Sequence, residues 1–160
     1  MDEKNGQVFK PLLGTDEATI DDKGRILVSK KKRERLGDGF VLALGEVGCL
    51  VAYPEPIWNQ MVSEVLAKDS LNLGRQMFTR LVFGLAEDDL KFDQQGRLVI
   101  PQKLRGLAKL KDRVVLVGCV DRLEIWAGSE HDQYLEDPKN YGDRRRQAIL
   151  DAQRLMNSTE

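Results

Sequence analysis

Two stretches of the chain carry one pattern: TIDDKGRILVSKKKRERLGDGF at residues 19–40 and LKFDQQGRLVIPQKLRGLAKL at residues 90–110. In both, an aspartate is followed three positions later by glycine, then by arginine and three aliphatic residues. Glycine supplies the positive φ angle of a tight reversal, and the aspartate carboxylate can accept hydrogen bonds from the turn's amides. The sequence therefore predicts two equivalent hairpin turns. Their residues are Asp21, Gly24 and Arg25 in the first copy and Asp93, Gly96 and Arg97 in the second.

Each copy predicts the same series of elements around its turn. Strands flank the first turn, and a short helix follows, with Ser29 as its N-cap and Gly37 at its end. In the second copy Pro101 stands in the place of Ser29. The expected strands lie at residues 15–20, 25–28, 40–44 and 49–53 in the first copy and at 113–118 and 123–126 in the second, and the expected helices lie at 30–36 and 102–108.

The strand at residues 113–118 indicates how the two copies combine. Residues 114–117 are apolar on both faces of that strand, so both faces must be covered. We therefore expect an α+β fold in which the copies interlock into one closed barrel, rather than standing apart as two sheets.

Two helix-like segments separate the copies, at residues 57–66 and 73–85, and each has a wide apolar stripe. We expect two packed helices, arranged as an antiparallel pair. A small barrel offers limited surface to cover both stripes, so two interpretations stay open. The stripes belong to the core of one subunit, or part of their apolar surface contacts another subunit.

The last stretch, residues 143–156, is helix-like and begins with Arg144, Arg145 and Arg146. Cations in the first turn of a helix oppose the helix dipole. Two interpretations follow: the arginines have a partner, or the segment is a loosely held tail. We favour the tail, because residues 157–160 offer no anchor.

The composition of the 160-residue chain is that of a soluble globular protein, with 41% hydrophobic and 32% charged residues. No apolar run reaches the roughly 18 to 20 residues of a membrane span, and residues 1–10 lack the apolar centre of a secretion signal, so we expect a cytoplasmic protein. Cys49 and Cys119 lie in strand-like stretches rather than in CxxC pairs, and His131 is the only histidine. These residues favour buried thiols over a disulfide or a metal site, and no cofactor is expected.

The net charge of −1 hides a strongly two-signed distribution. Seven basic side chains lie between positions 23 and 35, against the single acid Glu34, whereas acids gather elsewhere. Such a run is either a solvated helix face or part of a nucleic-acid interface. Its position beside a repeated turn gives the two interpretations equal weight. The basic residues are Lys23, Arg25, Lys30, Lys31, Lys32, Arg33 and Arg35.

The sequence shows no constellation of catalytic residues. It has one histidine and lacks a nucleophile elbow, a P-loop and a dinucleotide-binding glycine motif. Asp21 and Asp93 could form a pair of catalytic carboxylates, but each stands four residues before an arginine across a tight turn. Capping the turn or pairing with that arginine is the simpler role, so we expect both aspartates to be structural and the protein not to be an enzyme.

The doubled motif, together with VVLVG at residues 114–118 and LEIW at residues 123–126, resembles the MraZ family of regulators of bacterial division and cell-wall gene clusters. The resemblance covers residues 13–135. It implies a swapped-hairpin, double-split β-barrel of the SpoVT/AbrB kind, built from two internal repeats with helices between and after them. It also implies a ring-shaped homo-oligomer in the cytoplasm, associated with the nucleoid, that binds short direct repeats in double-stranded promoter DNA.

On this basis the chain divides into a first repeat with its following helix at residues 13–69, a linking helix and second repeat at 70–135, and a C-terminal extension at 136–160. The resemblance places the aspartate and arginine of each turn on the DNA-binding face, and basic helix residues are expected to anchor phosphates. The expected DNA-binding residues are Lys23, Arg25, Lys30, Lys31, Arg33, Arg97, Lys103 and Arg105, and the residues expected to shape the turns are Asp21, Gly24, Asp93 and Gly96.

The alternative function is an antitoxin-like or scaffold protein of the same barrel class, which binds another protein through the basic turns. A ring of subunits is expected to use one repeated contact. If Phe78 lies in that contact, Phe78→Glu should release smaller species.

Overall fold

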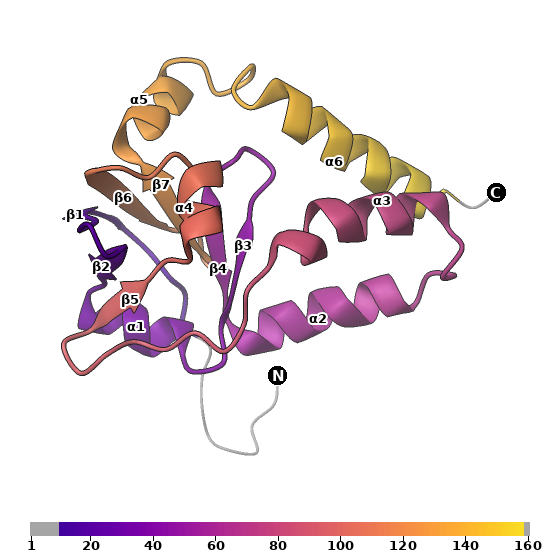
Figure 1. Ribbon diagram of the computed structural model, residues 1–160. Helices are drawn as coiled ribbons and strands as arrows, with labels where there is room; N and C mark the ends of the chain where they lie inside the picture. Colours follow the sequence, from indigo (N-terminus) through magenta and orange to yellow (C-terminus); the bar gives the residue numbers. More distant parts are fainter. Residues whose placement is uncertain (1–9, 159–160) are drawn as a thin grey trace.

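The computed structural model describes residues 10–158 as an α+β structure with antiparallel sheets. The strands are β1 (Thr15–Thr19), β2 (Arg25–Leu27), β3 (Val41–Leu44), β4 (Leu50–Tyr53), β5 (Arg97–Val99), β6 (Arg113–Gly118) and β7 (Leu123–Ala127). The helices are α1 (Lys30–Leu36), α2 (Glu55–Leu66), α3 (Leu73–Leu81), the 3-10 helix η1 (Phe83–Leu85), α4 (Gln102–Leu107), α5 (Gly128–Glu136) and α6 (Asp143–Met156). In Figure 1 the strands gather at one side, and α2, α3 and α6 form an arm on the other.

Strands of the two copies are mixed in both sheets. The larger sheet has the order β1-β6-β7-β4-β3, and β2 and β5 form a separate two-stranded ribbon. Three of the pairings join one copy to the other: β1 with β6, β4 with β7, and β2 with β5. The expected interlocking of the copies is therefore seen in the strand pairing, but the described strands form two sheets and not one closed barrel.

The two hairpins are shorter than the sequence predicts. Next to the first turn, one bridge joins Ile20 to Ile26, and next to the second turn one bridge joins Phe92 to Leu98. Beyond the bridge β1 runs along β6 while β2 runs along β5, so the strands that flank the first turn separate. The correction has a physical reason: each short strand gains a longer ladder of hydrogen bonds from the other copy than from its own hairpin.

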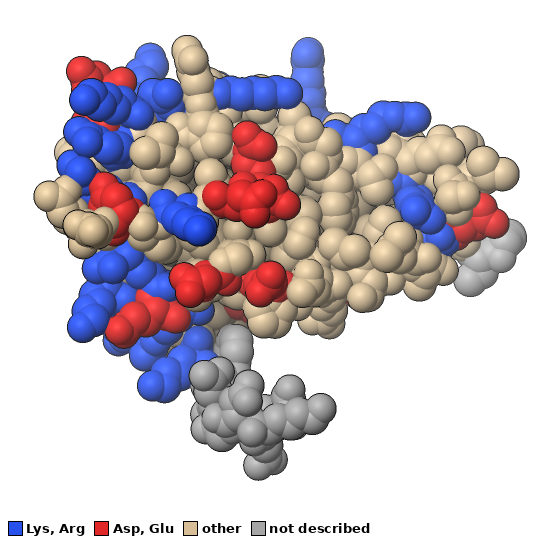
Figure 2. Space-filling view, turned by 60° about the horizontal axis from the view of Figure 1, so that its bottom comes forward, with Lys and Arg blue, Asp and Glu red and all other residues tan. Residues whose placement is uncertain are grey.

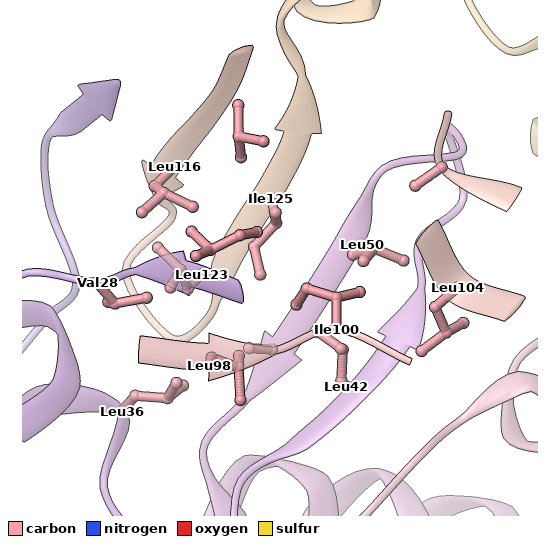
Figure 3. Packing of buried hydrophobic residues seen from close by; sticks show 14 of the residues in the cluster. Val28, Leu36, Leu42, Leu50, Leu98, Ile100, Leu104, Leu116, Leu123 and Ile125 are labelled. Atoms are coloured by element: carbon pink, nitrogen blue, oxygen red, sulfur yellow. The ribbon is translucent and has the colours of Figure 1, made fainter. Parts of the chain in front are cut away.

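The main core lies between the larger sheet and the ribbon. Figure 3 shows side chains of the ribbon region, such as Leu98 and Ile100, converging with side chains of the sheet, such as Leu42 and Ile125. Leu36 of α1 and Leu104 of α4 close the same cluster.

The other face of the larger sheet carries a second cluster. Val115 of β6, Tyr53 of β4 and Trp126 of β7 lie in it, and α2 packs against it through Ile57 and Trp58. Since the neighbouring residues of β6 face the main core, this strand is covered on both sides, as its apolar sequence predicts.

Both short helices begin where the sequence predicts. The Ser29 hydroxyl accepts a hydrogen bond from the Lys32 amide at 3.3 Å, and Gly37 ends α1 with its amide bonded to the Arg33 carbonyl. In the second copy Pro101 precedes α4, which ends at Leu107, one residue earlier than expected.

The helical arm corrects one expectation. α2 and α3 pack on each other through Val65 and Phe78, as expected of the two helices between the copies, but the main partner of α3 is α6. The close approach is made at Gly74, where an added Cβ atom would lie 2.5 Å from the Ala152 carbonyl oxygen. The C-terminal segment is therefore a docked helix and not a loose tail.

Arg145 at the start of α6 has hydrogen-bond partners within the chain, contrary to the tail interpretation. Its guanidinium donates hydrogen bonds of 2.7 Å to the carbonyls of Leu44, Gly45 and Leu81, and so ties the start of α6 to the sheet and to α3. Burial lowers the pKa of this guanidinium below its usual value. Three carbonyl dipoles offset the unfavourable position of the cation in the first helical turn.

Phe78 lies in the core of the arm. Its side chain is 8% exposed and packs in a cluster with Val82, Ile149 and Met156. Its use as a subunit contact is therefore ruled out, and a charge there would disrupt the core of the single chain.

None of the helices within residues 10–158 is long and apolar enough to cross a membrane.

Candidate nucleic-acid interface

The first turn is organised by the Asp21 carboxylate. One oxygen accepts hydrogen bonds from the amides of Lys23 at 3.0 Å and Arg25 at 2.9 Å, and the other pairs with the Arg25 Nε at 2.6 Å. The Arg25 amide contributes most to lowering the pKa of Asp21. Gly24, at φ +81°, closes the reversal with its amide bonded to the Asp21 carbonyl.

The second turn repeats this geometry. Asp93 accepts from the amides of Gln95 and Arg97, both at 2.9 Å, and its second oxygen pairs with the Arg97 Nε at 2.9 Å. The Arg97 amide is the main cause of the lowered pKa of Asp93. The structural role that the sequence predicts for both aspartates is present in the two turns.

The two aspartates also fix the orientation of the two arginines. Each arginine uses only its Nε toward the carboxylate, and within the described residues the terminal amino groups of Arg25 and Arg97 make no hydrogen bond. A guanidinium held in this way can still present two parallel donors to a phosphate or to a base edge.

The ribbon of β2 and β5 brings the two arginines to one surface. In its register Arg25 lies opposite Val99 and Leu27 lies opposite Arg97, while the central pair turns into the core. Leu27 is 58% exposed and Val99 is 52% exposed. The outer face therefore alternates two arginines with two aliphatic side chains, and a two-stranded ribbon of this kind fits the major groove of B-form DNA.

Leu27 and Val99 are exposed residues that sequence reasoning did not assign to the interface. Both belong to the aliphatic residues of the expected strands. The signal was the strict alternation around Ile26 and Leu98, which places the residues on either side of each buried position on the opposite face.

The other predicted site residues fall into two groups. Lys23, Lys30, Lys31 and Lys103 are exposed at the turn or on the short helices. Figure 2 shows that Lys and Arg gather at the end of the molecule where the ribbon and α1 lie. Arg33 and Arg105 are partly buried behind the turns.

Two members of the basic run serve the fold. Lys32 is 6% exposed, and its ammonium lies 2.8 Å from the Asp16 carboxylate of β1. Arg35 donates to the Pro11 carbonyl at 2.8 Å. The expectation that basic helix residues anchor phosphates is therefore wrong for Lys32, because its charge is paired inside the chain.

The described residues contain no cluster of three or more histidine, cysteine or acidic side chains that could hold a metal ion. Cys49 and Cys119 are unpaired thiols there, the first buried and the second partly buried. Burial raises the pKa of Cys49 well above its usual value and that of Cys119 to about 11. Both thiols are thus protonated near neutral pH, as expected of structural cysteines.

Comparisons with known proteins found a matching family model and similar relatives. The family model described as "MraZ protein, putative antitoxin-like" matches residues 12–81 and 83–149. A transcriptional regulator MraZ of Lactiplantibacillus plantarum is 40% identical over 78% of this chain and 86% of the relative. A protein of the same name from Roseiflexus sp. is 39% identical over 72% and 80%, and one from Pediococcus pentosaceus is 35% identical over 82% and 92%.

Proposed function

Because the chain belongs to the MraZ family and is a DNA-binding transcriptional regulator, we propose that it binds short direct repeats in the promoter of a division and cell-wall gene cluster. MraZ is a family of transcriptional regulators and not of enzymes. The proposal includes no catalytic role and no cofactor, and it places the protein in the cytoplasm at the nucleoid.

The observation that carries the proposal is the pair of carboxylate-oriented arginines on one ribbon. Arg25 and Arg97 keep their terminal amino groups available and lie on the outer face of the same two strands. In the proposed complex they approach base edges, while exposed lysines neutralise flanking phosphates. The first copy supplies Lys23, Arg25, Lys30 and Lys31 to this DNA-binding face, and the second supplies Arg97 and Lys103. Arg33 and Arg105 belong to the same basic group and lie partly buried behind the turns.

The proposal extends to the assembly. In it the sheet and ribbon are parts of a swapped-hairpin barrel made from repeats at residues 13–69 and 70–135, with an extension at 136–160. Subunits form a ring, so that several equivalent ribbons meet several operator repeats and weak contacts add through effective concentration. Light scattering of the unmodified protein tests the ring, because a mass near one 18.1 kDa chain at micromolar concentration would refute it.

Titration with duplex DNA from the region upstream of the gene tests the function. Arg25→Ala and Arg97→Ala should each reduce specific affinity by about 1–3 kcal/mol. Arg144, which is exposed on α6, provides the control, and Arg144→Ala should bind as the unmodified protein does. The melting temperature of each variant must stay close to that of the unmodified protein, and early unfolding would show that the arginines only brace their turns.

A second function is favoured by the two exposed aliphatic side chains of the ribbon. Leu27 and Val99 would suit an antitoxin-like or scaffold module that binds a protein through the same turns. Salt dependence separates the two functions. For each tenfold rise in salt concentration, the affinity for DNA falls by about 0.9 log units per neutralised phosphate. Affinity that is insensitive to salt would favour the protein partner.

A further inference from the structure

We propose that Arg33 and Arg105 are positioning residues, each of which holds the DNA-binding turn of the other repeat. The inference rests on the proposed function and deepens it, since it separates the basic residues that contact DNA from the basic residues that position those contacts. Under it, Arg105 of the second copy sets the position of Arg25, and Arg33 of the first copy sets that of Arg97.

The first contact lies between Arg105 and the turn at Gly24. A Cβ atom added at Gly24 would lie 2.7 Å from the Arg105 Cζ atom and 2.8 Å from its Nε atom. These distances leave no room for a methyl group, so the guanidinium lies directly against the bare backbone of the turn. Gly24 therefore has two roles: it adopts the φ angle of +81°, and it leaves the space that the Arg105 guanidinium occupies.

The second contact is the mirror of the first. A Cβ atom added at Gly96 would lie 2.7 Å from both Cζ and Nε of Arg33. Backbone hydrogen bonds cross in the same places: the Ile100 amide donates to the Gly24 carbonyl at 2.8 Å, and the Val28 amide donates to the Gly96 carbonyl at 3.1 Å. Each turn is therefore held by the strand end and by the helix of the opposite copy.

The surroundings of the two arginines favour an inward role over contact with DNA. Arg33 donates through its Nε to the Val28 carbonyl at 2.9 Å. The Arg105 Nε is buried and has no acceptor among the described residues, so that this side chain is held by packing alone. Lys103 lies on the same helix and is exposed, which shows that α4 has a solvent-facing position for a phosphate contact.

The position of each glycine explains how the effect reaches DNA. Gly24 immediately precedes Arg25, so any shift of the glycine backbone moves the Cα atom of that arginine and the base-directed donors with it. Discrimination between sequences depends on the placement of those donors, whereas the number of neutralised phosphates does not. Loss of a positioning residue should therefore reduce specificity without changing the salt dependence.

Hydrogen exchange in the absence of DNA tests the contact directly. Arg105→Ala should raise amide exchange at residues 21–25 and leave residues 93–97 unchanged, and Arg33→Ala should do the reverse. Lys103→Ala is the matched control on α4 and should leave both turns unchanged. Unaltered exchange at residues 21–25 in Arg105→Ala would overturn the proposal.

DNA titration gives the second arm. Arg105→Ala should lower the ratio of specific to non-specific affinity roughly tenfold at an unchanged salt slope. Lys103→Ala should instead reduce the salt slope by about 0.9. A reduced slope in Arg105→Ala, or full recovery of specificity by Arg105→Lys, would identify Arg105 as a phosphate contact and overturn the proposal.

Two outcomes need separate treatment: a variant that does not fold, and an unmodified protein that binds no DNA. If Arg105→Ala does not fold, Arg105→Met retains the aliphatic stem and is measured in both arms in its place. If the unmodified protein binds no DNA, the proposed function fails. The exchange experiment contains no DNA, so it decides the contact between the repeats independently of that result.

Discussion

Asp21 and Asp93 act on the amides of their own turns, over a separation of two to four residues. Because these contacts are local, the spacing of aspartate, glycine and arginine was enough to predict them. The same carboxylates then orient the arginines that face outward. One short motif therefore determines both the shape of the turn and the direction of its cation.

We predict that replacing both aspartates with asparagine reduces the acid sensitivity of the fold. Both carboxyl groups have lowered pKa values in the folded protein, so the unfolded chain takes up protons first as the pH falls through about 3.9. The free energy of unfolding therefore decreases below about pH 5, and the stabilisation is fully present above it. Urea unfolding at pH 6 and pH 3 should show a smaller difference for the double variant Asp21→Asn, Asp93→Asn.

Asp22→Asn is the control for this experiment. Asp22 lies in the same turn, is exposed, and forms no hydrogen bond or ion pair in the part of the chain that the structure describes. It should keep the full difference between the two pH values. An undiminished difference in the double variant would show that the turn carboxylates do not contribute to acid unfolding.

Residues with distant partners were beyond prediction from the sequence. Lys32 appeared to be one more member of a basic run, yet its partner Asp16 lies on another strand. Arg145 appeared unfavourable at a helix start, yet its three carbonyl partners lie on segments far earlier in the chain. A sequence shows which charges exist, but the fold decides which of them are paired.

At the scale of elements, local signals again decided what could be predicted. Ser29, Gly37 and Pro101 gave the limits of the two short helices because caps act within one turn. The apolar stripe of α3 showed that this helix is packed, but not against which partner. Its main partner is α6, and the two helices approach most closely at Gly74, where a side chain would meet the backbone of α6.

Gly74→Ala tests the docking of α6. The added methyl group would meet backbone atoms of Ala152 and Met156, which cannot move as a flexible side chain can. Separation of the two helices should cost about 1–3 kcal/mol, the usual range for overpacking. Urea unfolding gives the free energy, and the sedimentation or scattering profile shows whether α6 leaves the arm.

Gly106→Ala is the matched control for that variant. Gly106 also lies in a helix, and a Cβ atom there would meet nothing within 4 Å. Alanine should stabilise α4 by roughly 0.5–1 kcal/mol, since it restricts the unfolded chain and favours the helix. Equal effects at the two glycines would mean that helix propensity, and not contact with α6, determines the result at Gly74.

At the scale of the whole molecule, the repeat was visible in the sequence but the strand order was not. Duplication of a motif shows that two units exist, and the apolar β6 shows that they must cover one another. The order β1-β6-β7-β4-β3 depends on which strand pairings form the longer hydrogen-bond ladders. These pairings join residues far apart in the chain, so they form only in the assembled core.

The mixing of strands predicts that neither repeat folds alone. A cut between residues 69 and 70 lies in the exposed connection between α2 and α3, and it separates β1 from β6 and β2 from β5. Each fragment would lose the strands of the other repeat that complete the main core. Fragment 1–69 is also below the roughly 70–80 residues that usually hold a stable core unaided. Fragments 1–69 and 70–160 should each lack cooperative unfolding by circular dichroism, and mixing them in equal amounts should restore it.

The full chain cut by a protease at the same connection is the control, because its halves are already assembled. It should remain folded and bind DNA as the intact chain does, since none of the paired strands includes residues 67–72. Fragment 70–160 keeps the β6–β7 pair together with α3 and α6, so it is the more stringent of the two tests. Cooperative unfolding of that fragment on its own would show that the second repeat is an independent domain, and that the contacts of Arg33 and Arg105 between the turns join two domains rather than complete one core.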